Sequence, residues 1–274
     1  MDRDKILTRI AEALERGAPE TRGSANWRNF PAYVWEGQAA RAVELLDAPQ
    51  LGQLHGIDSQ KERVVENIAR HAAGHAAHDM LLWGARGMGK SALVRAALIS
   101  AQEVDPRRVA LVQVRGDALT TLPRLFSELA RAKRRFVVFL DDLGFADDDP
   151  IGPRALRSLL EGGVDARPDN VRMAITSNRR VIVPRQNDEQ DSPINPRDEI
   201  EDRLALADRF GLSVGFHSCS KDTYLAIVEV YAKPLGLDWE EGDALAWAMQ
   251  RGARSGRTAW QYVTEIAGRA GKTV

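Results

Sequence analysis

The sequence has one cysteine, no long apolar run and almost no net charge. Cys219 alone cannot form a disulfide within the chain, which suits a reducing compartment. The longest apolar runs, such as residues 136–140, are far too short to cross a bilayer. Charged residues at the beginning of the chain leave no apolar core for a secretion signal. We therefore expect a cytoplasmic protein with no membrane contact.

The balance of charge excludes a strong overall attraction to one class of partner. Lys and Arg number 38, Asp and Glu number 39, and the formal net charge is −1. No overall field draws such a chain to nucleic acid or to anionic lipid. Nucleic acid remains a possible partner through a local patch, but the net charge gives it no support. We interpret the basic run Lys133, Arg134, Arg135 as a solvated turn rather than as such a patch.

The middle of the chain alternates short apolar runs with amphipathic segments. The apolar runs predict strands at residues 80–83, 109–114, 136–140, 171–176 and 212–216. The amphipathic segments predict helices at residues 59–73, 91–102, 122–131 and 154–161. Strands and helices in this order form an α/β fold, a parallel sheet covered by helices on both faces. The strands lack a polar face, as expected where both sides are buried.

The two ends of the chain are predicted to be helical. At the amino end, helices are expected over residues 4–16 and near residues 38–46. After the last predicted strand, the pattern indicates helices only, at residues 221–232, 241–251 and 258–270. The sequence therefore predicts three units, which are an N-terminal helical region at residues 1–53, an α/β nucleotide-binding domain at 54–220 and a small C-terminal helical domain at 221–274.

A phosphate-binding pattern, G-x-x-x-x-G-K-[ST], follows the first of these strands and opens a helix. Its residues are Gly84, Ala85, Arg86, Gly87, Met88, Gly89, Lys90 and Ser91. The glycines permit a tight turn whose N–H groups point at phosphate oxygens, and the helix adds its positive dipole end. Lys90 supplies a cation for the terminal phosphates, and the Ser91 hydroxyl can bind Mg²⁺. We predict that this loop binds ATP with magnesium.

Two carboxylates, Asp141 and Asp142, end the predicted strand at residues 136–140. In an open parallel sheet, ligands bind outside the carboxyl ends of the strands. We therefore expect Asp141 to reach the magnesium shell and Asp142 to face the attacking water.

These two motifs, with four other segments, resemble the AAA+ ATPases. The segment VRMAITSN, at residues 171–178, resembles the sensor-1 strand. This resemblance implies that Asn178 helps to position the attacking water. The segment at residues 56–58 resembles the one that cradles adenine, which implies contacts from Gly56 and Ile57.

Two further resemblances concern arginines. The segment DRFG, at residues 208–211, resembles the box that carries the arginine finger, which implies this role for Arg209. Arg203, six residues earlier, is the alternative. The segment SGRTA in the helical end resembles sensor 2, which implies that Arg257 contacts the γ-phosphate from a helical lid. Arg254 competes for that position.

More narrowly, the segments LWGARG, TSNRR and DRFGL together resemble a bacterial family of AAA+ ATP-binding proteins of unknown function. The resemblance implies an oligomeric ATPase, with sites completed at subunit interfaces, that remodels an unknown macromolecular partner. One residue departs from the common pattern, because Asp142 stands where many AAA+ proteins have Glu. A shorter carboxylate favours slow turnover. The alternative is therefore a nucleotide-dependent switch or loader that acts with DNA machinery.

Overall fold

The computed structural model describes residues 25–144, 156, 158–160, 167–178 and 209–273. The helix expected at residues 4–16 lies outside these ranges. Of the helix expected at residues 154–161, the described residues are helical.

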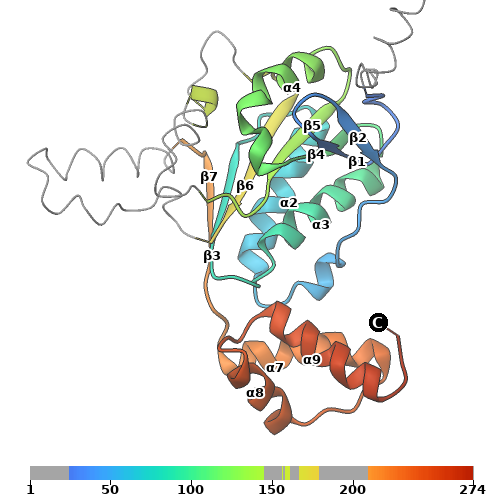
Figure 1. Cartoon of the computed structure of the whole chain (residues 1–274), viewed down its shortest axis with the longest axis vertical. Coiled ribbons are helices and arrows are strands. Elements are labelled where there is room, and N and C mark those ends of the chain that lie inside the picture. Colours follow the sequence, from blue (N-terminus) through green and yellow to red (C-terminus); the bar gives the residue numbers. More distant parts are fainter. Residues whose placement is uncertain (1–24, 145–155, 157, 161–166, 179–208, 274) are drawn as a thin grey trace, which may run out of the picture.

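One seven-stranded sheet forms the centre of the molecule (Figure 1). Its strands are β1 (Ala32–Trp35), β2 (Ala40–Val43), β3 (Met80–Gly84), β4 (Val109–Val114), β5 (Arg135–Leu140), β6 (Val171–Ser177) and β7 (Leu212–Phe216). They lie in the order β2-β1-β4-β5-β6-β3-β7. Neighbouring strands are parallel except for the pair β1 and β2. The five strands predicted from the apolar runs are all confirmed.

Helices cover both faces of this sheet, as predicted (Figure 1). The covering elements are α2 (Asp58–Ala73) and α3 (Lys90–Val104) on one face, and η2 (Gly116–Thr121) and α4 (Leu122–Leu129) on the other. Strand side chains alternate between the two layers. On β5, Val137 and Phe139 pack with α2 and α3, whereas Phe136 and Val138 pack on the α4 side. The sheet therefore separates two apolar cores.

The helix expected near residues 38–46 is wrong, because this segment contains β2, which pairs antiparallel with β1. Gly37 has a φ of 93°, and the amide of Glu36 donates to the carbonyl of Ala39 at 3.0 Å, so the chain reverses in a tight turn. β1 then lies along β4 and buries Trp35 completely. This tertiary pairing overrides the helical periodicity of a short segment. The boundaries of the three predicted units remain predictions.

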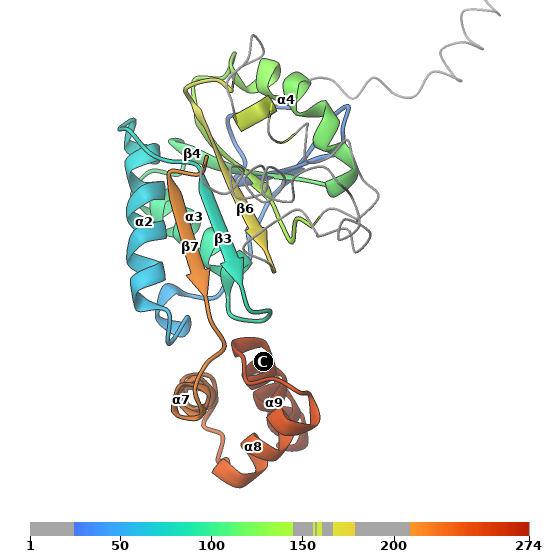
Figure 2. The same ribbon diagram turned by 90° about the vertical axis from the view of Figure 1, so that its left-hand side faces the viewer.

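The C-terminal helices form a layer beyond the carboxyl ends of β3 and β7 (Figure 2). They are α7 (Lys221–Ala232), η4 (Lys233–Leu235), α8 (Glu241–Gln250) and α9 (Gly256–Arg269), and together we call them the lid. Ser220 and Ser255 cap α7 and α9, because each hydroxyl accepts the amide three residues later, at 3.1 and 3.2 Å. The three helices predicted here are confirmed. No helix among the described residues is long and apolar enough to span a bilayer.

Arg134 overturns the interpretation of the basic run as a solvated turn. Its side chain is buried, with 5% of the residue exposed. The guanidinium donates to backbone carbonyls on two segments, those of Trp27, Arg28 and Phe30 before β1 and those of Pro106 and Val109 at β4. A buried guanidinium needs such acceptors for its N–H groups. Arg134 therefore fastens the segment before β1 to the sheet.

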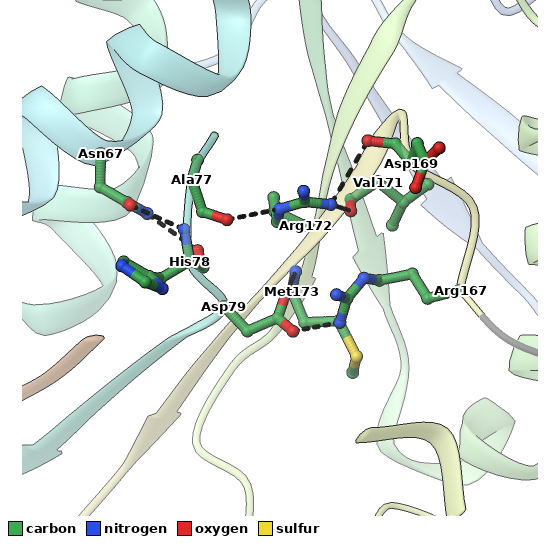
Figure 3. A network of polar contacts seen from close by, with 9 residues as sticks. All are labelled: Asn67, Ala77, His78, Asp79, Arg167, Asp169, Val171, Arg172 and Met173. Atoms are coloured by element: carbon green, nitrogen blue, oxygen red, sulfur yellow. Dashed lines mark hydrogen bonds and ion pairs between the residues drawn. The ribbon is translucent and has the colours of Figure 1, made fainter. Parts of the chain in front are cut away.

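A second polar cluster lies at the amino ends of β3 and β6 (Figure 3). Asp79 is 9% exposed, forms an ion pair with Arg167 and accepts the amide of Met173 at 2.7 Å. Asn67 of α2 exchanges two hydrogen bonds with the backbone of His78, each at 2.9 Å. These contacts hold helix α2 and the first residues of the strands β3 and β6 together.

Candidate nucleotide-binding site

The phosphate loop connects the end of β3 to the beginning of α3, as its pattern predicts. Gly84 has a φ of 120°, and a Cβ there would lie 2.0 Å from the carbonyl oxygen of Phe216. The amide of Ala85 donates to that same carbonyl at 2.8 Å. Gly89, with a φ of 85°, is the residue before α3. The loop therefore requires glycine at both ends, because neither position tolerates a side chain without strain.

Lys90 lies at the first turn of α3 and points back into the loop. It is 7% exposed. Its Nζ donates to the carbonyls of Gly84 and Ala85, both at 2.8 Å, and to Oδ1 of Asn178 at 3.2 Å. The structure thus brings Asn178, at the end of β6, to the lysine.

The charge of Lys90 is set by opposing neighbours. Burial lowers the pKa of Lys90 below its usual value, whereas the carboxylates of Asp142 and Asp141 raise it. The guanidinium groups of Arg257 and Arg86 lower it further. An anionic ligand at this loop would therefore meet three cationic side chains.

Asp141 and Ser91 form an oxygen pair at the carboxyl end of β5. The Ser91 hydroxyl donates to Oδ1 of Asp141 at 2.5 Å, and the same oxygen accepts from the hydroxyl of Thr176 at 2.6 Å. Mg²⁺ prefers oxygen ligands and takes one or two from protein, with phosphates and waters completing its shell. The described residues contain no cluster of three His, Cys, Asp or Glu side chains that could hold a metal by themselves. A hydroxyl and a carboxylate therefore fit magnesium that arrives with a nucleotide.

Asp142 has the only positive φ of a non-glycine residue among those described, 52°. Its backbone amide donates to the Thr176 hydroxyl at 2.7 Å, and its Oδ1 accepts from the side-chain amide of Asn178. Asp and Asn adopt this left-handed conformation several times more readily than most residues. This gives a local reason for Asp, rather than Glu, at a position where many AAA+ proteins have Glu.

The segment expected to cradle adenine lies between the phosphate loop and the lid. Gly56 has a φ of 75°, and a Cβ there would lie 2.4 Å from Cγ2 of Thr223 on α7. Ile57 is buried, and its Cδ1 lies 3.6 Å from the place of a Cβ on Gly89. The structure therefore places Ile57 at the loop and Gly56 against α7.

The beginning of α9 lies directly on the phosphate loop. The amide of Arg257 donates to the carbonyl of Gly87 at 3.1 Å. A Cβ on Gly87 would lie 2.6 Å from the Ser255 hydroxyl and 3.1 Å from Cβ of Arg257. Of the two arginines left open for sensor 2, Arg257 is the one in contact with the loop. Arg254 is exposed and lies near Cys219. Burial raises the pKa of the Cys219 thiol, and the charge of Arg254 opposes this shift.

Comparison with known proteins assigns this chain to a family. Residues 28–270 match the family model described as "Protein of unknown function (DUF815)". The chain belongs to this family. A search of curated proteins finds no match.

Solved structures show which fold this DUF815 member has. The chain is similar to RuvB of Thermotoga maritima, a Holliday junction branch migration motor, with a TM-score of 0.54 and 15% identity over 83% of this chain and 68% of that one. It is also similar to Orc1 of Aeropyrum pernix, solved in complex with DNA, with a TM-score of 0.56 and 18% identity over 79% of this chain and 61% of that one. This likeness concerns the fold, and the family member described here has the AAA+ P-loop fold.

Arg209 is the one described candidate that the structure does not bring to the loop of its own chain. It is exposed and precedes β7, whose far end, Phe216, contacts the loop. Strand residues advance about 3.3 Å each, so the two ends of β7, Leu212 and Phe216, are roughly 13 Å apart, and Arg209 precedes Leu212 by three residues. The competing Arg203 lies outside the described residues. Within one chain, Arg209 therefore lies before the amino end of β7, whereas the carboxyl end of this strand contacts the loop.

Sequence reasoning missed two polar residues of this AAA+ site. Thr176 contacts both aspartates, and Ser255 packs on Gly87. No signal in the sequence pointed to Thr176, because only the parallel pairing of β5 and β6 places it beside the residue after Leu140. For Ser255, the signal was a helix-capping serine directly before the segment assigned to sensor 2.

Proposed function

We propose that this protein is a cytoplasmic AAA+ ATPase that binds Mg-ATP at residues 84–91. ATP binding and hydrolysis would be coupled to remodelling of a macromolecular partner. The observation that carries this proposal is one network of hydrogen bonds at the carboxyl ends of three strands. It joins the side chains of Lys90, Ser91, Asp141, Thr176 and Asn178 with both the backbone amide and the carboxylate of Asp142. A network of cation, hydroxyl, carboxylates and amide has the composition that phosphoryl transfer requires.

Each of these residues has a role in the attack of water on the γ-phosphate. Lys90 stabilises negative charge on the terminal phosphates. Ser91 and Asp141 would hold magnesium, which would supply positive charge to neutralise the phosphates. Asp142 accepts a proton from the attacking water, and Asn178 orients that carboxylate. Arg257 contacts the γ-phosphate from the lid.

Substitution of Lys90 tests nucleotide binding. Lys90→Ala removes the cation at the loop, and we expect titration calorimetry with Mg-ATP to detect no tight binding. Lys272→Ala is the matched control, because Lys272 also donates to two backbone carbonyls, those of Leu235 and Gly236, at the far end of the lid. The control should bind ATP like the wild type. Unchanged affinity in Lys90→Ala would refute the assignment of the loop.

We further propose that the active form is an oligomer in which Arg209 acts on the neighbouring subunit. The distance of Arg209 from its own loop supports this role. Arg209→Ala should bind ATP nearly normally, yet lose about three orders of magnitude in hydrolysis. Mixing it with Lys90→Ala should restore part of the activity, because some interfaces then combine an intact loop with an intact arginine. A mixture without activity, together with hydrolysis per subunit that is independent of protein concentration, would contradict the oligomer.

A second candidate function is a nucleotide-dependent switch or loader that acts with DNA machinery and hydrolyses ATP slowly. Two observations favour it, the short carboxylate of Asp142 and the similarity of fold to RuvB and to Orc1, which are described with a Holliday junction and with DNA. Adding DNA to the ATPase assay separates the two functions. Stimulated hydrolysis and a DNA affinity that falls with salt would favour the switch. Hydrolysis that DNA does not change would favour another partner.

A further inference from the structure

The hydroxyl of Thr176 lies between the two aspartates of the candidate site. We propose that Thr176 is a positioning residue for ATP hydrolysis, which holds Asp141 and Asp142 in register through one hydroxyl group. This inference rests on the proposed ATPase function and adds a residue to its mechanism. No sequence motif discussed above gives Thr176 a role.

The directions of the two hydrogen bonds follow from chemistry. The backbone amide of Asp142 can only donate, so Oγ1 of Thr176 accepts at 2.7 Å. The hydroxyl proton is then free for Oδ1 of Asp141, 2.6 Å away. A hydroxyl can donate once and accept as well, and Thr176 uses both abilities. Valine has the same shape but neither ability.

Thr176 joins two halves of the network. One half is the oxygen pair of Ser91 and Asp141, which would face magnesium. The other half is the chain from Asp142 through Asn178 to Lys90, which would face the water and the γ-phosphate. Among the contacts of the described residues, the Thr176 hydroxyl links the halves. Beside the peptide bonds that join these residues, the hydroxyl thus adds a direct link between the metal side and the water side of the site.

The same hydroxyl stabilises the backbone conformation of Asp142. A φ of 52° is unfavourable for a residue with a side chain, and it persists only where its surroundings fix it. The amide of Asp142 donates to Oγ1 of Thr176, and the amide of Leu143 donates to the Thr176 carbonyl at 2.8 Å. Thr176 itself is 1% exposed and lies in β6 between β5 and β3. A rigid, buried residue thus determines the direction of an exposed carboxylate.

Three variants test the inference. Thr176→Val removes the hydroxyl and keeps the volume, Thr176→Ser keeps the hydroxyl, and Thr121→Val is the matched control. Thr121 accepts from Nε1 of Trp35 at 2.8 Å and donates to the Ala118 carbonyl at 2.6 Å, so its hydroxyl bridges in the same way outside the candidate site. Hydrolysis is measured as kcat, KM and the Mg²⁺ concentration at half-maximal rate. ATP affinity is measured separately in EDTA.

We expect Thr176→Val to lower kcat about 10- to 100-fold and to raise the Mg²⁺ requirement, as is typical when a residue that orients a metal ligand is lost. ATP affinity in EDTA should not change, because the loop and Lys90 are intact. Thr176→Ser should stay within about threefold of the wild type, since it keeps the hydroxyl. Thr121→Val should keep the wild-type kcat. If Thr176→Val does not fold, as judged by circular dichroism, Thr176→Ala is assayed with the same expectation.

The outcomes separate this inference from the proposed function. A wild type that hydrolyses ATP, together with Thr176→Val at the same kcat and Mg²⁺ requirement, would overturn the role of Thr176 alone. Equal losses in kcat and in EDTA affinity would also overturn it, because they indicate general damage to the site. A wild type that binds no ATP would overturn both.

Discussion

The two ends of the central sheet hold polar side chains in different ways. At the amino ends of the strands, the buried groups contact mainly backbone. Arg134 donates to backbone carbonyls on two segments, and His71 has Nε2 3.1 Å from the carbonyl of Phe136. At the carboxyl ends, side chains contact other side chains, and the carboxylates of Asp141 and Asp142 are exposed.

We infer from this difference that the polar groups at the amino ends stabilise the fold, whereas those at the carboxyl ends are available to bind ligands. Both terminal nitrogens of the buried Arg134 guanidinium donate to backbone carbonyls, and a ligand could not displace those partners without unfolding the backbone. Side chains that hold each other at an exposed edge can exchange these partners for a phosphate, a metal ion or a water. We therefore expect changes at the carboxyl ends to affect activity, and changes at the amino ends to affect stability.

The largest effect is expected at Asp142. Asp142→Asn removes the group that accepts a proton from water, and kcat should fall about 10²- to 10⁴-fold. The temperature of unfolding should stay within about 2 °C, because Asn adopts a positive φ as readily as Asp. ATP hydrolysis and thermal unfolding measure the two effects, with the exposed Asp117→Asn as control. A variant that turns over like the wild type would show that Asp142 is not the base.

The opposite behaviour is expected at Arg134. Arg134→Met leaves carbonyls of two segments without their donor, and the free energy of unfolding should fall by about 3 kcal/mol. The folded fraction should keep the wild-type kcat. Urea unfolding measures the stability, and Arg135→Met is the control. Arg135 reaches the Asp169 and Gly74 carbonyls only at 3.4 Å, so its loss should matter by less than about 1 kcal/mol. Equal losses of unfolding free energy in Arg134→Met and Arg135→Met would contradict the structural role assigned to Arg134.

The smallest effect is expected at His71, where a loss of stability appears only at acidic pH. Burial lowers the pKa of His71 from 6.5 to about 4. The unfolded chain therefore takes up this proton first as the pH falls, and stability is lost between about pH 6.5 and pH 4. This histidine alone should remove about 2 kcal/mol between about pH 7 and pH 5. His71→Gln keeps a donor for the Phe136 carbonyl, and urea unfolding of this variant should vary correspondingly less with pH. An unchanged pH profile would show that His71 is not the group that titrates.

The sequence was sufficient for features that depend on near neighbours. The strands β3 to β7 were each visible as an apolar run, and the phosphate loop has a fixed spacing, whereas the buried strand β1 was not predicted. Features that depend on distant segments were not visible. Arg134 is buried because carbonyls more than 100 residues away in sequence surround it, for example that of Phe30. Thr176 gained a role only through the register of β5 and β6, and the choice between Arg254 and Arg257 depended on how α9 meets the loop.

The amide of Arg257 contacts Gly87 at the beginning of α9, so a small rotation of this helix about the contact would displace its far end the most. α9 has 14 residues. At about 1.5 Å per residue, it extends roughly 20 Å from its contact with Gly87. A tilt of about 10° at the phosphate loop would move the far end of α9 by roughly 3–4 Å. A displacement too small to alter the core would thus be larger at the far end of α9, which is Arg269.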